Sequence, residues 1–115
     1  PGTANPPRAF HRHAVETELT SEPGHTVLSL RDQMTHADRV NFDNLIPGLI
    51  KGGQPVIIDV AGLQYMDSAG LGMLLNLHDK ATKTSLSLRI RKPRGDVKQL
   101  MNLSCMDRLI PIEWQ

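Results

Sequence analysis

The chain has 115 residues, of which 39% are hydrophobic, and this size is typical of one globular domain with a single core. Its formal net charge of +1 and aromatic content of 3% argue against nucleic acid or an anionic membrane as partner, because both favour basic surfaces and single strands favour stacking side chains. One cysteine, Cys105, excludes an intrachain disulfide and fits a cytoplasmic location, and no apolar run approaches the roughly 20 residues needed for membrane insertion.

Residues 1–12 are rich in proline and small polar residues, which predicts a flexible lead before one domain over residues 13–115. Because the chain begins at Pro1 without a methionine, we expect it to be processed or cut from a longer protein. His11 and His13 could contact one metal ion, but no third ligand stands near them, so we predict no metal site.

The first regular elements are predicted to form a β-hairpin at one edge of a sheet. Val15 to Leu19 alternates apolar residues with glutamates, which is typical of a half-buried strand. Glu22 to Gly24 has the composition of a turn, and Val27 to Leu30 reads as the second strand.

A first helix is predicted to begin near Thr35, because Asp38 follows three residues later and the pair resembles a capping box. Apolar residues then recur at helical spacing, at Phe42, Leu45, Ile46 and Leu49. Pro47 lacks an amide hydrogen, so we expect the helix to kink or end near Leu45 or Ile46.

The central stretch predicts a buried strand from Val56 to Val60, a loop over residues 61–65 and a second helix beginning near Ser68. Asp67 and Ser68 are both residue types that cap helices. A phosphate on Ser68 would be stabilised by the helix dipole and the free amides of the first turn. Gly70 and Gly72 are expected to leave the outer surface of that turn without side chains.

The remaining residues predict a strand from Leu86 to Ile90, a basic turn from Lys92 to Gly95, a helix capped by Asp96, and a short closing turn and strand from Met106 to Ile112. Cys105 is predicted to be a structural residue at the end of this helix. The order of elements indicates an α/β single domain with a mixed four- to five-stranded sheet and helices packed against it.

Enzymatic chemistry finds little support in these residues. Met66 stands where a nucleophile elbow would have its first glycine, and Gly70 and Gly72 lack the lysine and loop length of a phosphate-binding loop. We therefore expect no enzyme activity and no cofactor. The arginines and lysine around the basic turn are interpreted as a solvated face that can also steer an acidic partner.

The stretch Asp67 to Leu75, which reads DSAGLGMLL after an apolar strand, resembles the signature of STAS domains, in particular of the bacterial anti-sigma factor antagonists. The resemblance runs from about Val27 to Ile112 and implies the same mixed sheet. It implies that Ser68 is a phosphate acceptor. The partner surface that it implies around this serine comprises Asp67, Ala69, Gly70, Gly72, Met73 and Thr35, although Thr35 stands where the family has an aspartate.

This resemblance implies a signalling protein of partner switching and transcription regulation. The unmodified domain would bind a serine kinase that is also an anti-sigma factor, phosphorylation of Ser68 would release it, and a serine phosphatase would reverse the modification. Two alternatives stay open, because related STAS modules carry similar motifs: a constitutive adaptor subunit of a bacterial lipid-transport ABC system, and a regulatory domain of a larger sensor or transporter chain.

Overall fold

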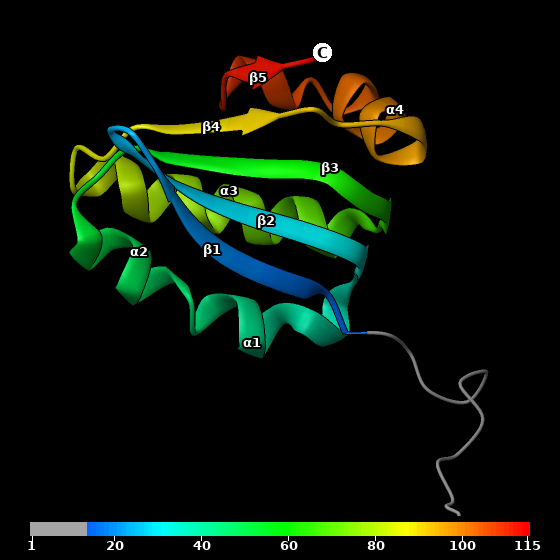
Figure 1. The fold of residues 1–115 in the computed structure, drawn as a ribbon. Helices are drawn as coiled ribbons and strands as arrows, with labels where there is room; N and C mark the ends of the chain where they lie inside the picture. Colours follow the sequence, from blue (N-terminus) through cyan, green and yellow to red (C-terminus); the bar gives the residue numbers. More distant parts are fainter. Residues whose placement is uncertain (1–13) are drawn as a thin grey trace, which may run out of the picture.

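The computed structural model describes residues 14–115, so the predicted lead over residues 1–12 and the pair His11 and His13 lie outside the described residues. Figure 1 shows one layer of strands with helices against it. The strands are β1 (Glu16–Glu22), β2 (His25–Met34), β3 (Val56–Met66), β4 (Leu88–Arg91) and β5 (Ile112–Glu113). The helices are α1 (Arg39–Asp43), α2 (Ile46–Gly52), α3 (Ser68–Lys83) and α4 (Gly95–Leu103), with short 3-10 helices η2 (His36–Asp38) and η3 (Met106–Arg108).

The sheet has five strands in the order β1-β2-β3-β4-β5. β1 and β2 form an antiparallel hairpin, whereas β2, β3, β4 and β5 are parallel to one another. The predicted class, an α/β domain with a mixed sheet, is thereby confirmed. Because the strands follow one another in sequence order and parallel crossovers are right-handed, each crossover places its helix on the same face of the sheet.

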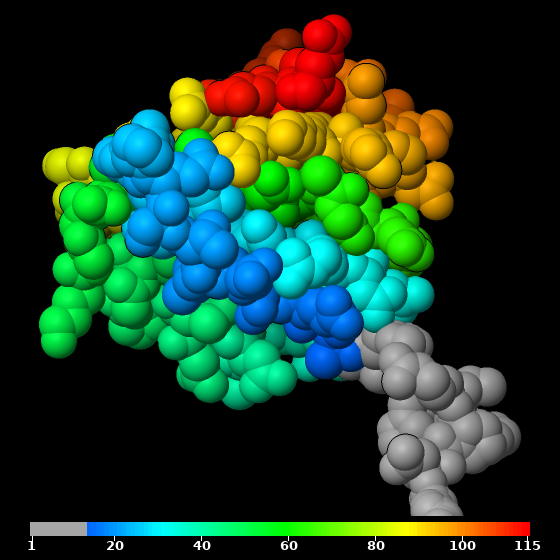
Figure 2. Space-filling view, viewed as in Figure 1, coloured from blue at the N-terminus to red at the C-terminus, as the bar shows by residue number. Residues whose placement is uncertain are grey.

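The hydrophobic core lies between this face and the helices. It joins alternate residues of the strands, such as Leu28 and Ile58, to buried residues of all four helices, such as Leu74 and Met101. Val27 and Ile57 point to the opposite face and are also buried. Figures 1 and 2 view this opposite face, where the strands lie side by side without a helix over them.

Two strand predictions were wrong in part. The first strand is not half-buried, because every residue of β1 is exposed and Leu19 retains 52% of its accessible surface. The predicted loop over residues 61–65 belongs to β3, which continues to Met66 beside the second half of β2. Two register shifts between these strands, after Ser29 and after Asp32, break the alternation that would have marked a strand in the sequence.

The break in the first helix is confirmed. The predicted single helix is divided into η2, α1 and α2. Asn44 and Leu45, between α1 and α2, keep right-handed helical dihedral angles, but the Leu45 amide donates to the Phe42 carbonyl, so the regular α-helical hydrogen bonding is interrupted there. Pro47 lies in the first turn of α2, where a missing amide hydrogen costs nothing, whereas in a continuous helix the carbonyl of Asp43 would lose its partner.

Candidate functional site

The first turn of α3 emerges directly from the end of β3 and carries Ser68 as its first residue. Asp67 is the N-cap, and its Oδ1 accepts a hydrogen bond from the amide of Gly70 at 3.0 Å. Ser68 is exposed, and within residues 14–115 its hydroxyl makes no hydrogen bond. Because Asp67 alone caps the helix, this hydroxyl is available for chemistry.

Asp67 also joins the end of β2 to the start of α3. Its Oδ2 accepts a hydrogen bond from the amide of His36 at 3.2 Å, and its own amide donates to the carbonyl of Met34 at 3.2 Å. The His36 ring nitrogen Nδ1 lies 3.7 Å from the same carboxylate oxygen. These bonds hold the end of β2 and the start of α3 together, and so they fix the position of Ser68.

The buried carboxylate of Asp38 holds the backbone of Thr35 beside the start of α3. Asp38 is 1% exposed, and its Oδ2 accepts the amide of Thr35 at 2.8 Å while its Oδ1 accepts the amide of Val15 at 3.0 Å. The predicted helix start at Thr35 is confirmed as the start of η2. The sequence pattern indicated the local pair but not the bond that ties it to the beginning of β1.

Helices α1 and α3 run side by side in the same direction. Asn76 Nδ2 donates to Asp43 Oδ1 at 3.4 Å, and one turn earlier in both helices the Arg39 guanidinium lies over Gly72. A Cβ atom built on Gly72 would be 3.8 Å from Arg39 Nη2. Sequence reasoning did not single out Arg39 or His36, because their position beside the serine depends on this helix register.

The residues predicted to surround Ser68 do not all reach the surface. Asp67, Ala69, Gly72 and Thr35 are partly exposed at this end of the sheet, whereas Gly70 and Met73 are buried. The expectation that Gly70 leaves the outer surface bare was wrong, because its missing side chain faces inward: a Cβ there would be 2.5 Å from Met66 Cγ and 3.2 Å from the Met34 carbonyl oxygen. Met73 is fully buried, so a docked partner cannot touch its side chain.

The sequence analysis also did not identify two exposed apolar residues in elements that adjoin the serine helix. Val40 on α1 is 71% exposed, and Tyr65 at the end of β3 is 45% exposed. Each lies in an element that adjoins the first turn of α3. Both residues are candidates for the apolar part of a docking surface.

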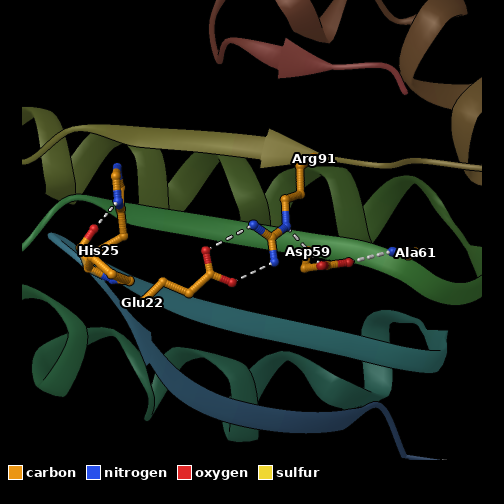
Figure 3. Close-up of polar contacts among 6 residues, drawn as sticks. Glu22, His25, Asp59, Ala61 and Arg91 are labelled. Atoms are coloured by element: carbon orange, nitrogen blue, oxygen red, sulfur yellow. Dashed lines mark hydrogen bonds and ion pairs between the residues drawn. The ribbon is translucent and has the colours of Figure 1, made fainter.

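The basic residues of β4 are ion-paired (Figure 3). Arg91 Nε lies 2.9 Å from Asp59 Oδ2, and its two terminal nitrogens lie 3.2 and 3.0 Å from the carboxylate oxygens of Glu22. Arg89 Nε lies 2.9 Å from Glu113 Oε2. The interpretation as a solvated face was therefore wrong for Arg91, whose side chain is 19% exposed, whereas the Arg89 side chain is 41% exposed. The ion pairs of Arg91 join the hairpin to β3 and β4.

This network alters the acid–base behaviour of its members. The hydrogen bond from Arg91 lowers the pKa of Glu22, and bonds to Glu22 and Asp59 raise the pKa of Arg91. Burial would raise the pKa of Asp59, but the hydrogen bonds from the Ala61 amide and from Arg91 outweigh it and hold that pKa below its usual value. All three groups are therefore held in their charged forms.

Within residues 14–115 the structure contains no group of three or more side chains placed to hold a metal ion. None of the helices in this part of the chain is both long enough and apolar enough to cross a membrane.

The fold and site together define a class: a one-domain α/β protein whose helices share one face of a mixed sheet and whose N-capped central helix begins with an exposed serine. The chain belongs to the STAS domain family, since a family model described as "Mlab, STAS domain" matches residues 17–111.

Solved structures with the same fold include anti-sigma factor antagonists. One from Mycobacterium paratuberculosis has a TM-score of 0.73 at 18% identity, over 89% of this chain and 87% of that one. The anti-sigma factor antagonist SpoIIAA in its unphosphorylated form has a TM-score of 0.60 at 18% identity, over 83% of this chain and 96% of that one. The phosphorylated form of the Bacillus cell fate determinant SpoIIAA has a TM-score of 0.63 at 18% identity, over 86% and 90%. No curated protein matches the chain.

Proposed function

We propose that this STAS domain is an anti-sigma factor antagonist, a protein-binding switch that is controlled by phosphorylation of Ser68 and works in the cytoplasm. The observation that carries the proposal is the exposed Ser68 hydroxyl at the start of α3, left unbonded within the described residues because Asp67 caps the helix. The likeness to SpoIIAA structures in both phosphorylation states supports it.

The partner serine kinase supplies the catalytic groups, and this domain is its substrate. The Ser68 oxygen forms a bond to the γ-phosphorus of ATP, the bond from that phosphorus to the bridging oxygen of ADP breaks, and the serine proton passes to a base of the kinase. A phosphatase returns the hydroxyl by transferring the phosphoryl group to water. The domain contributes a rigid presentation of the acceptor, which Asp67 provides through its bonds to Gly70 and His36.

The unmodified surface around Ser68 binds the kinase in this proposal. Exposed Val40 and Tyr65 give the surface an apolar component. Phosphate adds about −1.5 to −2 charges, which must be desolvated or repelled at the interface. A coupling of about 1–3 kcal/mol would weaken binding by roughly five- to 150-fold, which is sufficient to release the partner.

The test compares three forms of the chain in binding to the cognate serine kinase, with and without ATP and magnesium. Ser68→Ala should fold normally because Asp67 remains as the cap, should accept no phosphate, and should stay bound when ATP is added. Ser68→Asp should bind more weakly than the parent without unfolding, since a carboxylate is stabilised in the first turn of a helix. Equal affinity of all three forms, with no phosphate incorporated into the parent, would refute the switch.

A constitutive adaptor is the second candidate, because the matching family model is described as "Mlab, STAS domain" and not as an antagonist. An adaptor of a lipid-transport ABC system would bind its partner with the same affinity whether residue 68 is Ser, Ala or Asp. The same binding series therefore distinguishes the two candidates.

A further inference from the structure

Arg39 is an exposed arginine that has no carboxylate partner among the described residues. Its guanidinium nevertheless lies against α3, since Nη2 is 3.8 Å from the position that a Cβ of residue 72 would take. Gly72 leaves this space open. The guanidinium therefore lies over the first turns of α3. Within residues 14–115, none of its hydrogen-bond donors is bonded to a carboxylate.

The register of the two helices fixes where this guanidinium stands relative to Ser68. Three contacts follow one another along the parallel pair: His36 with Asp67, Arg39 with Gly72, and Asp43 with Asn76. Ser68 precedes Gly72 by four residues and so occupies the same face of α3, with Cβ positions about 5–6 Å apart. Ser68 therefore falls between the levels of His36 and Arg39.

We propose that Arg39 binds the phosphate of phosphorylated Ser68, an inference that rests on the function proposed above. A phosphoserine at position 68 presents three acceptor oxygens, and the planar fork of an arginine binds two such oxygens at once. The carboxylate of Asp67 also lies beside this position, but the amides of Gly70 and His36 already satisfy its oxygens.

This contact would give phosphorylation two effects on the surface of this domain that binds the kinase. In the unmodified protein Arg39 is free to meet an acidic group of the kinase, next to the apolar Val40. In the phosphorylated protein Arg39 is engaged by the phosphate of its own chain. The modification then both adds negative charge and withdraws a cation from the docking surface.

The experiment uses the full chain with phosphoserine placed at position 68 by genetic encoding, so that no kinase is required. The second ionisation of the phosphate, near pH 6 in a free phosphoserine, is followed by ³¹P NMR. Its pKa should be lower in the parent than in Arg39→Gln by roughly half a unit to one unit, because a guanidinium nearby favours the dianion. Arg39→Lys should give an intermediate value.

Arg94→Gln is the matched control, since Arg94 is also exposed and follows the neighbouring strand β4. This variant should titrate like the parent. His36 and Asp67 are present in every form, so their influence on the phosphate cancels in the comparison. Thermal unfolding of each form checks that the substitutions leave the fold intact.

Equal phosphate pKa values in the parent and in Arg39→Gln would overturn the proposed contact. That result would leave the switch itself standing, because kinase binding and phosphate transfer are measured separately. Conversely, a domain that no kinase modifies would refute the switch, and the titration would still show whether Arg39 reaches the phosphate.

Discussion

Gly70 and Gly72 are two residues apart in α3, but their missing side chains leave room for different neighbours. A methyl group on Gly70 would meet Met66 Cγ at 2.5 Å and the Met34 carbonyl oxygen at 3.2 Å, and this carbonyl belongs to backbone that Asp67 holds in place. A methyl group on Gly72 would meet only Arg39 Nη2, at the ordinary contact distance of 3.8 Å.

We expect opposite effects when each glycine is replaced by alanine. Gly70→Ala should lower the free energy of unfolding by about 1–2 kcal/mol, because overpacking outweighs the gain in helix propensity. Gly72→Ala should raise it by about 0.5–1 kcal/mol, because alanine restricts the unfolded chain and favours the helix. Urea unfolding of the two variants measures both changes, and shifts of the same sign would contradict the assigned packing.

The sequence motif could not separate these two glycines. The stretch DSAGLG correctly predicted an exposed serine at a helix start, because cap residues and helical spacing are local properties. Whether a glycine faces the sheet or a neighbouring helix depends on how α3 is rotated against β2 and α1, and that is determined by long-range packing. For the same reason Met73 was assigned to the partner surface although it is buried.

At the end of helix α4, the residue type does not suit the backbone conformation. Cys105 follows the helix with φ of 56°, in the left-handed region that favours glycine, and it is exposed. The predicted position of Cys105 at the end of this helix is confirmed, and the structure shows in addition that this residue is exposed.

We expect Cys105→Gly to raise the free energy of unfolding by about 1 kcal/mol, because glycine adopts this backbone conformation without steric cost. Cys105→Ser is the matched control, since serine keeps the Cβ atom and should change stability little. Urea unfolding gives both values. A Gly variant no more stable than the Ser variant would show that the left-handed conformation costs nothing here.

Elements with a strong local pattern were predicted well, and elements shaped by neighbours were not. The core strand from Val56, the helix from Ser68 and the break before Pro47 all follow from periodicity or from proline chemistry. The extension of β3 through Gly62 was missed because its pattern is broken by two register shifts. Gly62 itself lies against the Arg31 side chain, where a Cβ would be 2.6 Å from Cγ, and only the sheet register shows this contact.

For the domain as a whole, the ion pairs of Arg91 join strands that are far apart in the sequence. Glu22 ends β1, Asp59 lies in β3 and Arg91 ends β4, so the network spans the open face of the sheet. No sequence pattern predicts this arrangement, because it depends on strand order. Its energetic contribution depends on both carboxylates keeping their charge.

The direction of the pKa shifts predicts how stability depends on acidity. The pKa values of Asp59 and Glu22 in the folded protein lie below their ordinary values of about 4, so the unfolded chain binds protons first as pH falls. The stabilisation should be complete above about pH 5 and should disappear as the pH falls below 4 through the lowered pKa values.

Urea unfolding of the parent and of Asp59→Asn between about pH 2.5 and 6 tests this dependence. The parent should lose more stability on acidification than the variant, which lacks one of the titrating groups. Asp79→Asn is the control, because Asp79 pairs on the helix surface with Lys83 and shows no such network. Parallel pH profiles of parent and Asp59→Asn would contradict the expected role of the network.

The outer edge of β1 has a consequence for how copies of this chain meet in solution. β1 stands at the end of the strand order, so within the described residues its free backbone amides and carbonyls face no further strand. Such an edge can accept a strand from another molecule and start a continuous intermolecular sheet. Glu16, Glu18 and Glu22 recur along this strand, and each is paired with an arginine of its own chain, Arg31 or Arg91. A strand added at this edge would have to desolvate or rearrange these charged side chains, and this cost disfavours polymerisation through β1.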